Sequence, residues 1–164
     1  MSPSATGRIY LAVIAVLVVV IAAMAYKFVV AGSTQRSADG RVAVELAPGE
    51  RDLMLREMRE FVAGLQALSD GLARNDMPAV AEAARRMGTA RTHDVPAAMM
   101  GKLPLGFKSI ALGVHRQFDT IAADAAAGGE PRHTLAQISD VLQQCVACHA
   151  AYRVATPAGV PARD

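Results

Sequence analysis

The sequence predicts an all-α protein, an antiparallel four-helix bundle preceded by a single N-terminal transmembrane helix. Three observations lead to this fold class. Apolar residues recur at alternating steps of three and four along most of the chain, which is the helical period. Only seven of the 164 residues are aromatic, three Tyr and four Phe with no Trp, whereas strands favour aromatic and β-branched side chains. Finally, no stretch shows the period-two alternation that strands produce.

The first element is an uncharged apolar segment near the N-terminus. Residues Ile9–Tyr26 carry no charge, and apolar sequence resumes after Lys27 and continues to Ala31. As a helix, the segment from Ile9 to Ala31 would be roughly 34 Å long, enough to cross the hydrocarbon core of a bilayer. The Lys27 ammonium could reach the membrane interface. We therefore expect residues 1–31 to form an uncleaved transmembrane anchor.

A cleaved secretory signal is the alternative for this segment. Ala23-Met24-Ala25 offers a small-x-small cleavage site, and Arg8 supplies a weak positive region before the apolar core. The apolar stretch before that site is longer than the usual core of a signal peptide, about 7–15 residues, and this favours an anchor. Residues 32–48 are polar and interrupted by Gly40 and Pro48, so we expect them to be a tether.

Four amphipathic helices are expected in a domain covering residues 49–155. Proline, glycine and capping residues mark their ends, and Asn75-Asp76 are expected to end the first helix and cap the second. The helices begin after Pro48-Gly49, near Pro78, near Leu105 and at Pro131. The second should end near Arg91, a short turn is expected around residues 97–100, and residues 156–164 should be an irregular tail. Helices with such short connections pack most simply as an antiparallel bundle.

Apolar stripes on the first and last of these helices predict which faces point inward. The stripe of the first helix repeats with steps of four and three and consists of Met54, Met58, Phe61, Leu65, Leu68 and Leu72. The corresponding inward positions of the last helix are Leu135, Ile138, Leu142, Cys145, His149 and Tyr152.

The charge balance excludes one class of function. Of the 17 Lys and Arg residues, Arg8 and Lys27 belong to the N-terminal segment, so the rest of the chain carries 15 basic and 15 acidic residues. Binding to nucleic acid phosphates requires a basic surface. We therefore expect no nucleic acid partner.

The most informative motif is Cys145-Val146-Ala147-Cys148-His149. Two thiols one helical turn apart can form thioethers with the two vinyl groups on one edge of a haem. The adjacent imidazole of His149 can then bind the iron as the proximal ligand. On a helix, Cys145 and His149 are four residues apart and share a face. The pattern therefore predicts one covalently bound haem c with its iron.

Two other interpretations of the cysteine pair are weaker. A thioredoxin-type redox motif would be expected near a βαβ unit, and the sequence contains none. A zinc site needs four ligands, whereas Cys145, Cys148 and His149 supply three and the chain has no other cysteine. Because haem is attached to this motif outside the bacterial cytoplasm, we expect a single-pass inner-membrane protein with its bundle in the periplasm.

The segment Cys145–Arg153, CVACHAAYR, near the end of a helical chain resembles the class II cytochromes c, the cytochrome c-prime family. The resemblance covers about residues 48–155 and implies that Cys145 and Cys148 hold haem and that His149 ligates iron. It places Arg153 beside the proximal haem face, although Arg153 could instead be a solvated residue that complements the dipole at the helix end. Tyr152 would pack against the haem edge or the core, and Arg51 would approach a propionate.

The resemblance leaves the sixth iron ligand open. Some family members place a first-helix methionine on the iron and carry electrons, while others keep the position empty and bind gases such as nitric oxide. Met58, or alternatively Met54, could be that ligand, or both could fill the core. Other methionines (Met87, Met99 and Met100) are weaker candidates, as is His115. The remaining histidines, His93 and His133, lie at helix boundaries and are expected to be structural.

We therefore expect a membrane-anchored electron carrier, not an enzyme, with redox partner proteins of a respiratory or photosynthetic chain. A five-coordinate haem protein that binds nitric oxide is the alternative. A peroxidase would need a distal acid and base, and off the apolar stripe the first helix offers only Glu57 and Arg51. Many relatives pair through their first two helices, so a homodimer also remains open.

Overall fold

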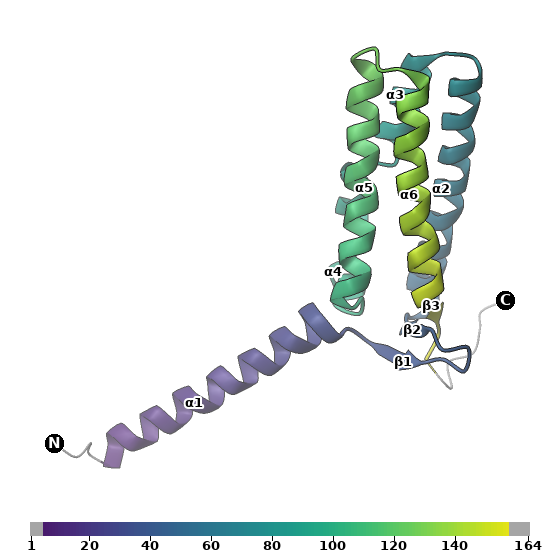
Figure 1. The fold of residues 1–164 in the computed structure, drawn as a ribbon. Helices are drawn as coiled ribbons and strands as arrows, with labels where there is room; N and C mark the ends of the chain where they lie inside the picture. Colours follow the sequence, from purple (N-terminus) through teal and green to yellow (C-terminus); the bar gives the residue numbers. More distant parts are fainter. Residues whose placement is uncertain (1–4, 158–164) are drawn as a thin grey trace.

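The computed structural model describes residues 5–157, which are mostly helical, with six α-helices and a small three-stranded sheet (Figure 1). In chain order the elements are α1 (Ala5–Ala25), the π-helical turn η1 (Tyr26–Ala31), β1 (Thr34–Arg36), β2 (Val42–Glu45), α2 (Pro48–Ala73), α3 (Met77–Arg85), the 3-10 helix η2 (Thr89–Asp94), α4 (Ala97–Met100), α5 (Leu105–Ala126), α6 (Pro131–Ala151) and β3 (Tyr152–Ala155). Most of the tail expected over 156–164 lies outside the described residues.

The long helices α2, α5 and α6 run side by side with the shorter α3, and successive ones alternate in direction (Figure 1). Close packing joins α2 to α3, α3 to α5, and α5 to α6. By contrast, α2 and α6 approach each other much less closely. One long side of the helical domain is therefore more open than the other three.

Two apolar clusters fill the domain. The upper core lies toward the turns that join α2 to α3 and α5 to α6, and its buried members are Leu68, Val80, Ala81, Ala83, Ala84, Met87, Val114, Phe118, Ile121, Ala122, Ala125, Ile138 and Val141. The lower core lies next to the sheet, and its buried members are Val44, Leu46, Met54, Met99, Leu103 and Phe107. Burial of these apolar surfaces is the main stabilising contribution to the fold.

Most helix boundaries follow the expected punctuation. The side chain of Asp76 caps α3 by accepting a hydrogen bond from the Ala79 amide at 3.0 Å, as predicted. The second helix, however, ends at Arg85 and not near Arg91. Its end is followed by Gly88, where a side chain would collide with the Asp119 carboxylate. That carboxylate accepts hydrogen bonds from the amide and hydroxyl of Thr89 and so holds the turn into η2.

The sheet corrects the all-α prediction. β1 pairs antiparallel with β2, and β2 pairs in parallel with β3, so the end of α6 is joined to a segment more than 100 residues earlier. The strands have three or four residues, too few for a clear period-two signal. In addition, Ala43 and Val44 are both buried, so the central strand does not alternate.

The segment 32–48, expected as a tether, is packed against the helical domain. It contributes both β1 and β2, and Val44 and Leu46 are completely buried in the lower core. The Leu46 amide donates a hydrogen bond to the carbonyl of Ala155 at 2.9 Å. This segment is therefore part of the folded domain.

The N-terminal helix is apolar and stands apart from the rest of the described chain (Figure 1). Within Gly7–Ala31, an 18-residue window has a mean hydropathy of 2.8, and none of that window is buried in the protein. Its length and composition suit a membrane-crossing helix, and an N-terminal signal sequence would have the same properties. The exposed helix is thus consistent with either a membrane anchor or a signal.

Candidate functional site

The two cysteines lie on the last turns of α6 and link the two cores. Cys145 packs against the upper core and Cys148 against the lower core, and both are half-buried free thiols. Burial raises the pKa of both thiols, and for Cys148 the neighbouring Cys145 adds to the effect. Burial therefore favours the neutral thiol over the thiolate at both cysteines.

His149 lies next to these thiols but is exposed. Its carbonyl accepts a 3.4 Å hydrogen bond from Nη1 of Arg41, which connects the end of α6 to the loop between β1 and β2. The structure corrects the expected inward stripe of α6, because Leu135 and Leu142 are 60% and 43% exposed. Ile138 is buried as predicted, and the other buried residues of the helix are Thr134 and Val141.

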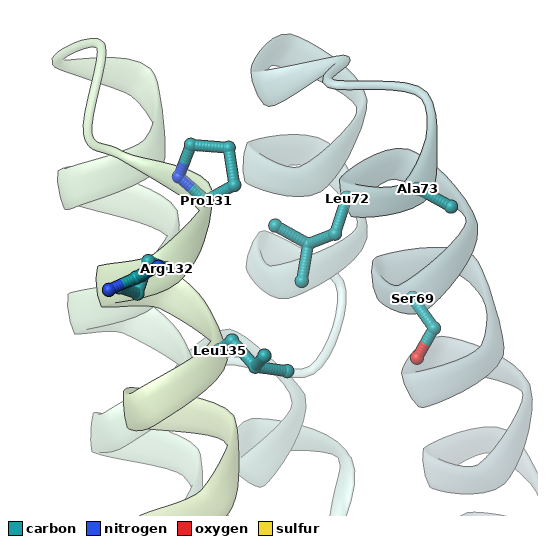
Figure 2. Close-up of a pocket in the computed structure, with 6 residues that line it drawn as sticks. All are labelled: Ser69, Leu72, Ala73, Pro131, Arg132 and Leu135. Carbon is teal, nitrogen blue, oxygen red and sulfur yellow. The ribbon is translucent and has the colours of Figure 1, made fainter.

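The first turns of α6 face α2 across a pocket. Figure 2 shows this pocket, whose volume is about 410 Å³. It is lined by Ser69, Leu72 and Ala73 of α2 and by Pro131, Arg132 and Leu135 of α6. Residues seven positions apart lie on nearly the same helix face. Leu142 and His149 follow Leu135 at this spacing, so they point to the same side of α6.

Exposed apolar side chains continue along this side toward the cysteines. Val146 of α6 is 70% exposed, and Val62 of α2, seven residues before Ser69, is 68% exposed. We call Val62, Leu135, Leu142 and Val146 the apolar seam. It follows the open side of the domain, where α2 and α6 do not pack closely. Periodicity alone did not distinguish this exposed seam from the buried stripe beside it.

The first-helix methionines and Cys148 belong to or pack against the same lower core. Met54 is buried there, and Met58 is half-buried against the same cluster, which Cys148 and Tyr152 also contact. The structure therefore brings both candidate sixth ligands to the region of the motif. Two further methionines, Met99 and Met100, belong to this cluster, whereas Met87 lies in the upper core.

The residues after the motif leave the helix. Tyr152 begins β3, is half-buried, and packs edge-on against Phe107 with ring centroids 5.5 Å apart. Arg153 is an exposed strand residue whose Nη1 donates to the Ser37 hydroxyl at 2.9 Å. It does not complement the helix dipole from within α6, because the helix ends at Ala151. Arg51 is half-buried in the first turn of α2 and forms no ion pair with any described residue.

The other histidines have structural environments or lie on the surface. His115 is buried, donates from Nδ1 to the Met87 carbonyl at 2.7 Å, and packs against Phe61. His133 is exposed beside Asp124, and His93 is exposed at the end of η2. Within residues 5–157, no group of three or more His, Cys, Asp or Glu side chains is arranged to hold a metal ion.

One charged cluster was not anticipated from the sequence. Arg91 of η2 donates from Nε and Nη2 to the two carboxylate oxygens of Glu57 at 2.8 and 2.9 Å, and it also pairs with Glu60. These hydrogen bonds lower the pKa of Glu57 despite its partial burial. Glu57 thus serves to hold η2 against α2, which makes it a poor candidate for a distal acid or base. The sequence could not predict this ion pair, because Arg91 and Glu57 come together only through the packing of η2 against α2.

Comparison of the chain with protein-family models, curated proteins and solved structures finds no match.

Proposed function

We propose that this protein is a membrane-anchored monohaem c-type cytochrome that transfers electrons in the bacterial periplasm. The observation that carries the proposal is the Cys-x-x-Cys-His motif on a helix end that faces an open, apolar side of the domain. The proposed fold unit is an antiparallel four-helix bundle of α2, α3, α5 and α6. The proposed topology is a single pass through the inner membrane by the N-terminal helix.

The residues at this site fit a flat, largely apolar group bound at one edge. Cys145 and Cys148 would form the two thioethers, and His149 is exposed on the side of α6 that carries the apolar seam. Exposed apolar side chains in contact with water are unfavourable, and a porphyrin bound at the motif would bury the two members of the apolar seam nearest to it, Leu142 and Val146. When bound, the haem iron would supply reversible one-electron oxidation and reduction.

The protein's own residues would hold and shield this group. The half-buried cysteines, which pack against the two cores, would hold its edge. Met54 and Met58 lie in the lower core with Cys148, so a sulfur ligand from α2 is available without unfolding the helix. We propose Met58 as that ligand, with Met54 as the alternative, because Met58 is only half-buried and can change rotamer more easily.

A gas-binding haem protein is the second candidate. It is favoured if Met58 stays packed in the lower core, where it lies in this structure. For either function we propose no enzymatic role, and the engagement of Glu57 by Arg91 argues against the distal acid or base that a peroxidase would need. Its redox partners would be proteins of a respiratory or photosynthetic chain, and a homodimer is compatible with it.

An absorption spectrum of the reduced protein, with and without carbon monoxide, tests the two candidates. The protein should be produced in a host competent for cytochrome maturation. A low-spin spectrum that carbon monoxide does not change supports the electron carrier, and the Met58→Ala protein should then become high-spin and bind the gas. Met54→Ala is the matched control and should stay low-spin. A high-spin wild type that binds carbon monoxide rapidly would favour the gas-binding protein.

A further inference from the structure

The junction between the apolar N-terminal helix and the helical domain is held by hydrogen bonds. The Lys108 ammonium, on the first turn of α5, donates to the carbonyl of Phe28 at 2.8 Å and to that of Val29 at 3.3 Å. The Ser33 amide donates to the carbonyl of Lys102 at 2.7 Å. These contacts join the last turns of the apolar helix to the segment that leads into α5.

Gly32 forms the tightest point of this junction. Its φ is +65°, a backbone conformation that residues other than glycine rarely adopt. A side chain at this position would also collide with the backbone of Lys102, Leu103 and Pro104. Its amide donates to the Lys27 carbonyl at 2.9 Å, and its own carbonyl accepts from the Lys27 ammonium at 2.5 Å. We call residues 26–33 the elbow.

The segment that receives the elbow is itself fixed to α2. The Lys102 ammonium pairs with Glu50 Oε2 at 2.6 Å, and the same oxygen accepts the Ala47 amide at 2.8 Å. The elbow therefore contacts a part of the domain that is tied both to α5 and to the start of α2. Such a connection restricts rotation of the domain about the end of the apolar helix far more than a flexible tether would.

We propose that the elbow orients the helical domain so that its lower end, with the sheet and residues 145–149, faces the lipid headgroups. Figure 1 shows that α1 leaves the domain at this end and that α6 ends there. Arg36 and Arg153 are exposed on the sheet, and within the described residues neither forms an ion pair. Their guanidinium groups fit lipid phosphates, which are bound by Arg through charge-assisted hydrogen bonds.

This inference rests on the membrane anchor of the proposed function but not on the haem. If the proposed orientation and the proposed haem are both correct, electrons would enter or leave at the membrane-facing end of the domain. The two ends of α5 are about 33 Å apart, given its 22 residues. A probe at its first turn and a probe at the opposite end of the domain should therefore differ clearly in their distance from the bilayer.

Two exposed leucines provide a matched pair of probe sites. Leu105, at the start of α5, is 46% exposed, and Leu135, at the opposite end of the domain, is 60% exposed. The chain contains no Trp, so Leu105→Trp and Leu135→Trp each introduce a single fluorophore. Each full-length protein is reconstituted into phosphatidylcholine–phosphatidylglycerol vesicles, with and without a lipid that carries a nitroxide on its headgroup. For each variant, the Trp fluorescence intensity with the nitroxide lipid is divided by the intensity without it, and this ratio measures the proximity of the Trp to the headgroups. Both intensities are measured on the same protein preparation, so any haem it contains affects them equally.

The orientation predicts quenching of Leu105→Trp and none of Leu135→Trp. Adding Gly32→Val, or separately Lys108→Gln, should reduce the difference between the two sites, and circular dichroism checks that each variant stays helical. Equal quenching at both sites in vesicle-bound protein would overturn the orientation while leaving the anchor intact. A protein that does not float with the vesicles in a density gradient would overturn the anchor itself, and the orientation with it.

Discussion

Leu46→Ala measures whether the segment before α2 is a structural part of the domain. Leu46 is completely buried in the lower core, where Met54, Met99 and Phe107 are also buried. The substitution removes three carbon groups, which corresponds to a lost transfer free energy of about 2.4 kcal/mol at about 0.8 kcal/mol per group. The cavity left behind adds to this loss, so the expected decrease in the free energy of unfolding is about 2.5–4 kcal/mol.

The measurement is urea unfolding of the full-length protein in a fixed concentration of detergent, followed by circular dichroism. A shift of the midpoint with an unchanged slope would report a change in stability alone. Leu135→Ala is the matched control, because this leucine is 60% exposed and should change the free energy of unfolding by less than about 0.5 kcal/mol. If Leu46→Ala were as mild as the control, residues 32–48 would be a tether and the packing described here would be wrong.

Three further predictions concern the helical domain. Arg91→Gln should lower the free energy of unfolding by roughly 1 kcal/mol at pH 7. The loss is expected to be small because Arg91 and Glu57 are both partly exposed, so solvent screens their attraction. The pairing lowers the pKa of Glu57 in the folded state, so its contribution is present above the unfolded pKa and is lost as pH falls through the folded pKa. Urea titrations of both proteins should therefore converge in acid, and a difference that persisted there would exclude this cause. Asp76→Ala should lower the thermal stability by about 1 kcal/mol through loss of the α3 cap, whereas Asp76→Asn should keep most of it; equal losses would contradict the capping role. Gly88→Ala should destabilise the turn before η2 because its side chain would meet the Asp119 carboxylate, and faster amide hydrogen exchange at Thr89 would reveal this, while unchanged exchange would not fit.

The helices could be predicted from the sequence because their signals are local. Pro131 begins α6, Asp76 caps α3 and Leu105 begins α5 as expected, since caps and prolines act within one turn. The sheet could not be predicted, because β2 and β3 come from opposite ends of the domain and neither strand is longer than four residues. Their pairing depends on where α6 ends in space, which no local pattern encodes.

The candidate site shows the same division. Cys145, Cys148 and His149 form a local motif, so the sequence identifies them without any knowledge of the fold. Their surroundings depend on packing. The sequence predicted that Leu142 would be inward, but α2 and α6 do not close over it, and it is 43% exposed. The run Val42–Leu46 was the one available signal that the supposed tether is buried, because it is apolar apart from Glu45.

Covalent attachment of one haem through Cys145 and Cys148 is most directly tested by the intact mass of the denatured protein. The protein should be produced in a host competent for cytochrome maturation, and Cys145→Ser/Cys148→Ser is the control. The wild type should retain the added mass of one haem and its colour after extraction with acidified acetone, and the double variant should lose both. A wild type with the bare polypeptide mass, or one that releases its pigment to the solvent, would contradict the proposed cytochrome.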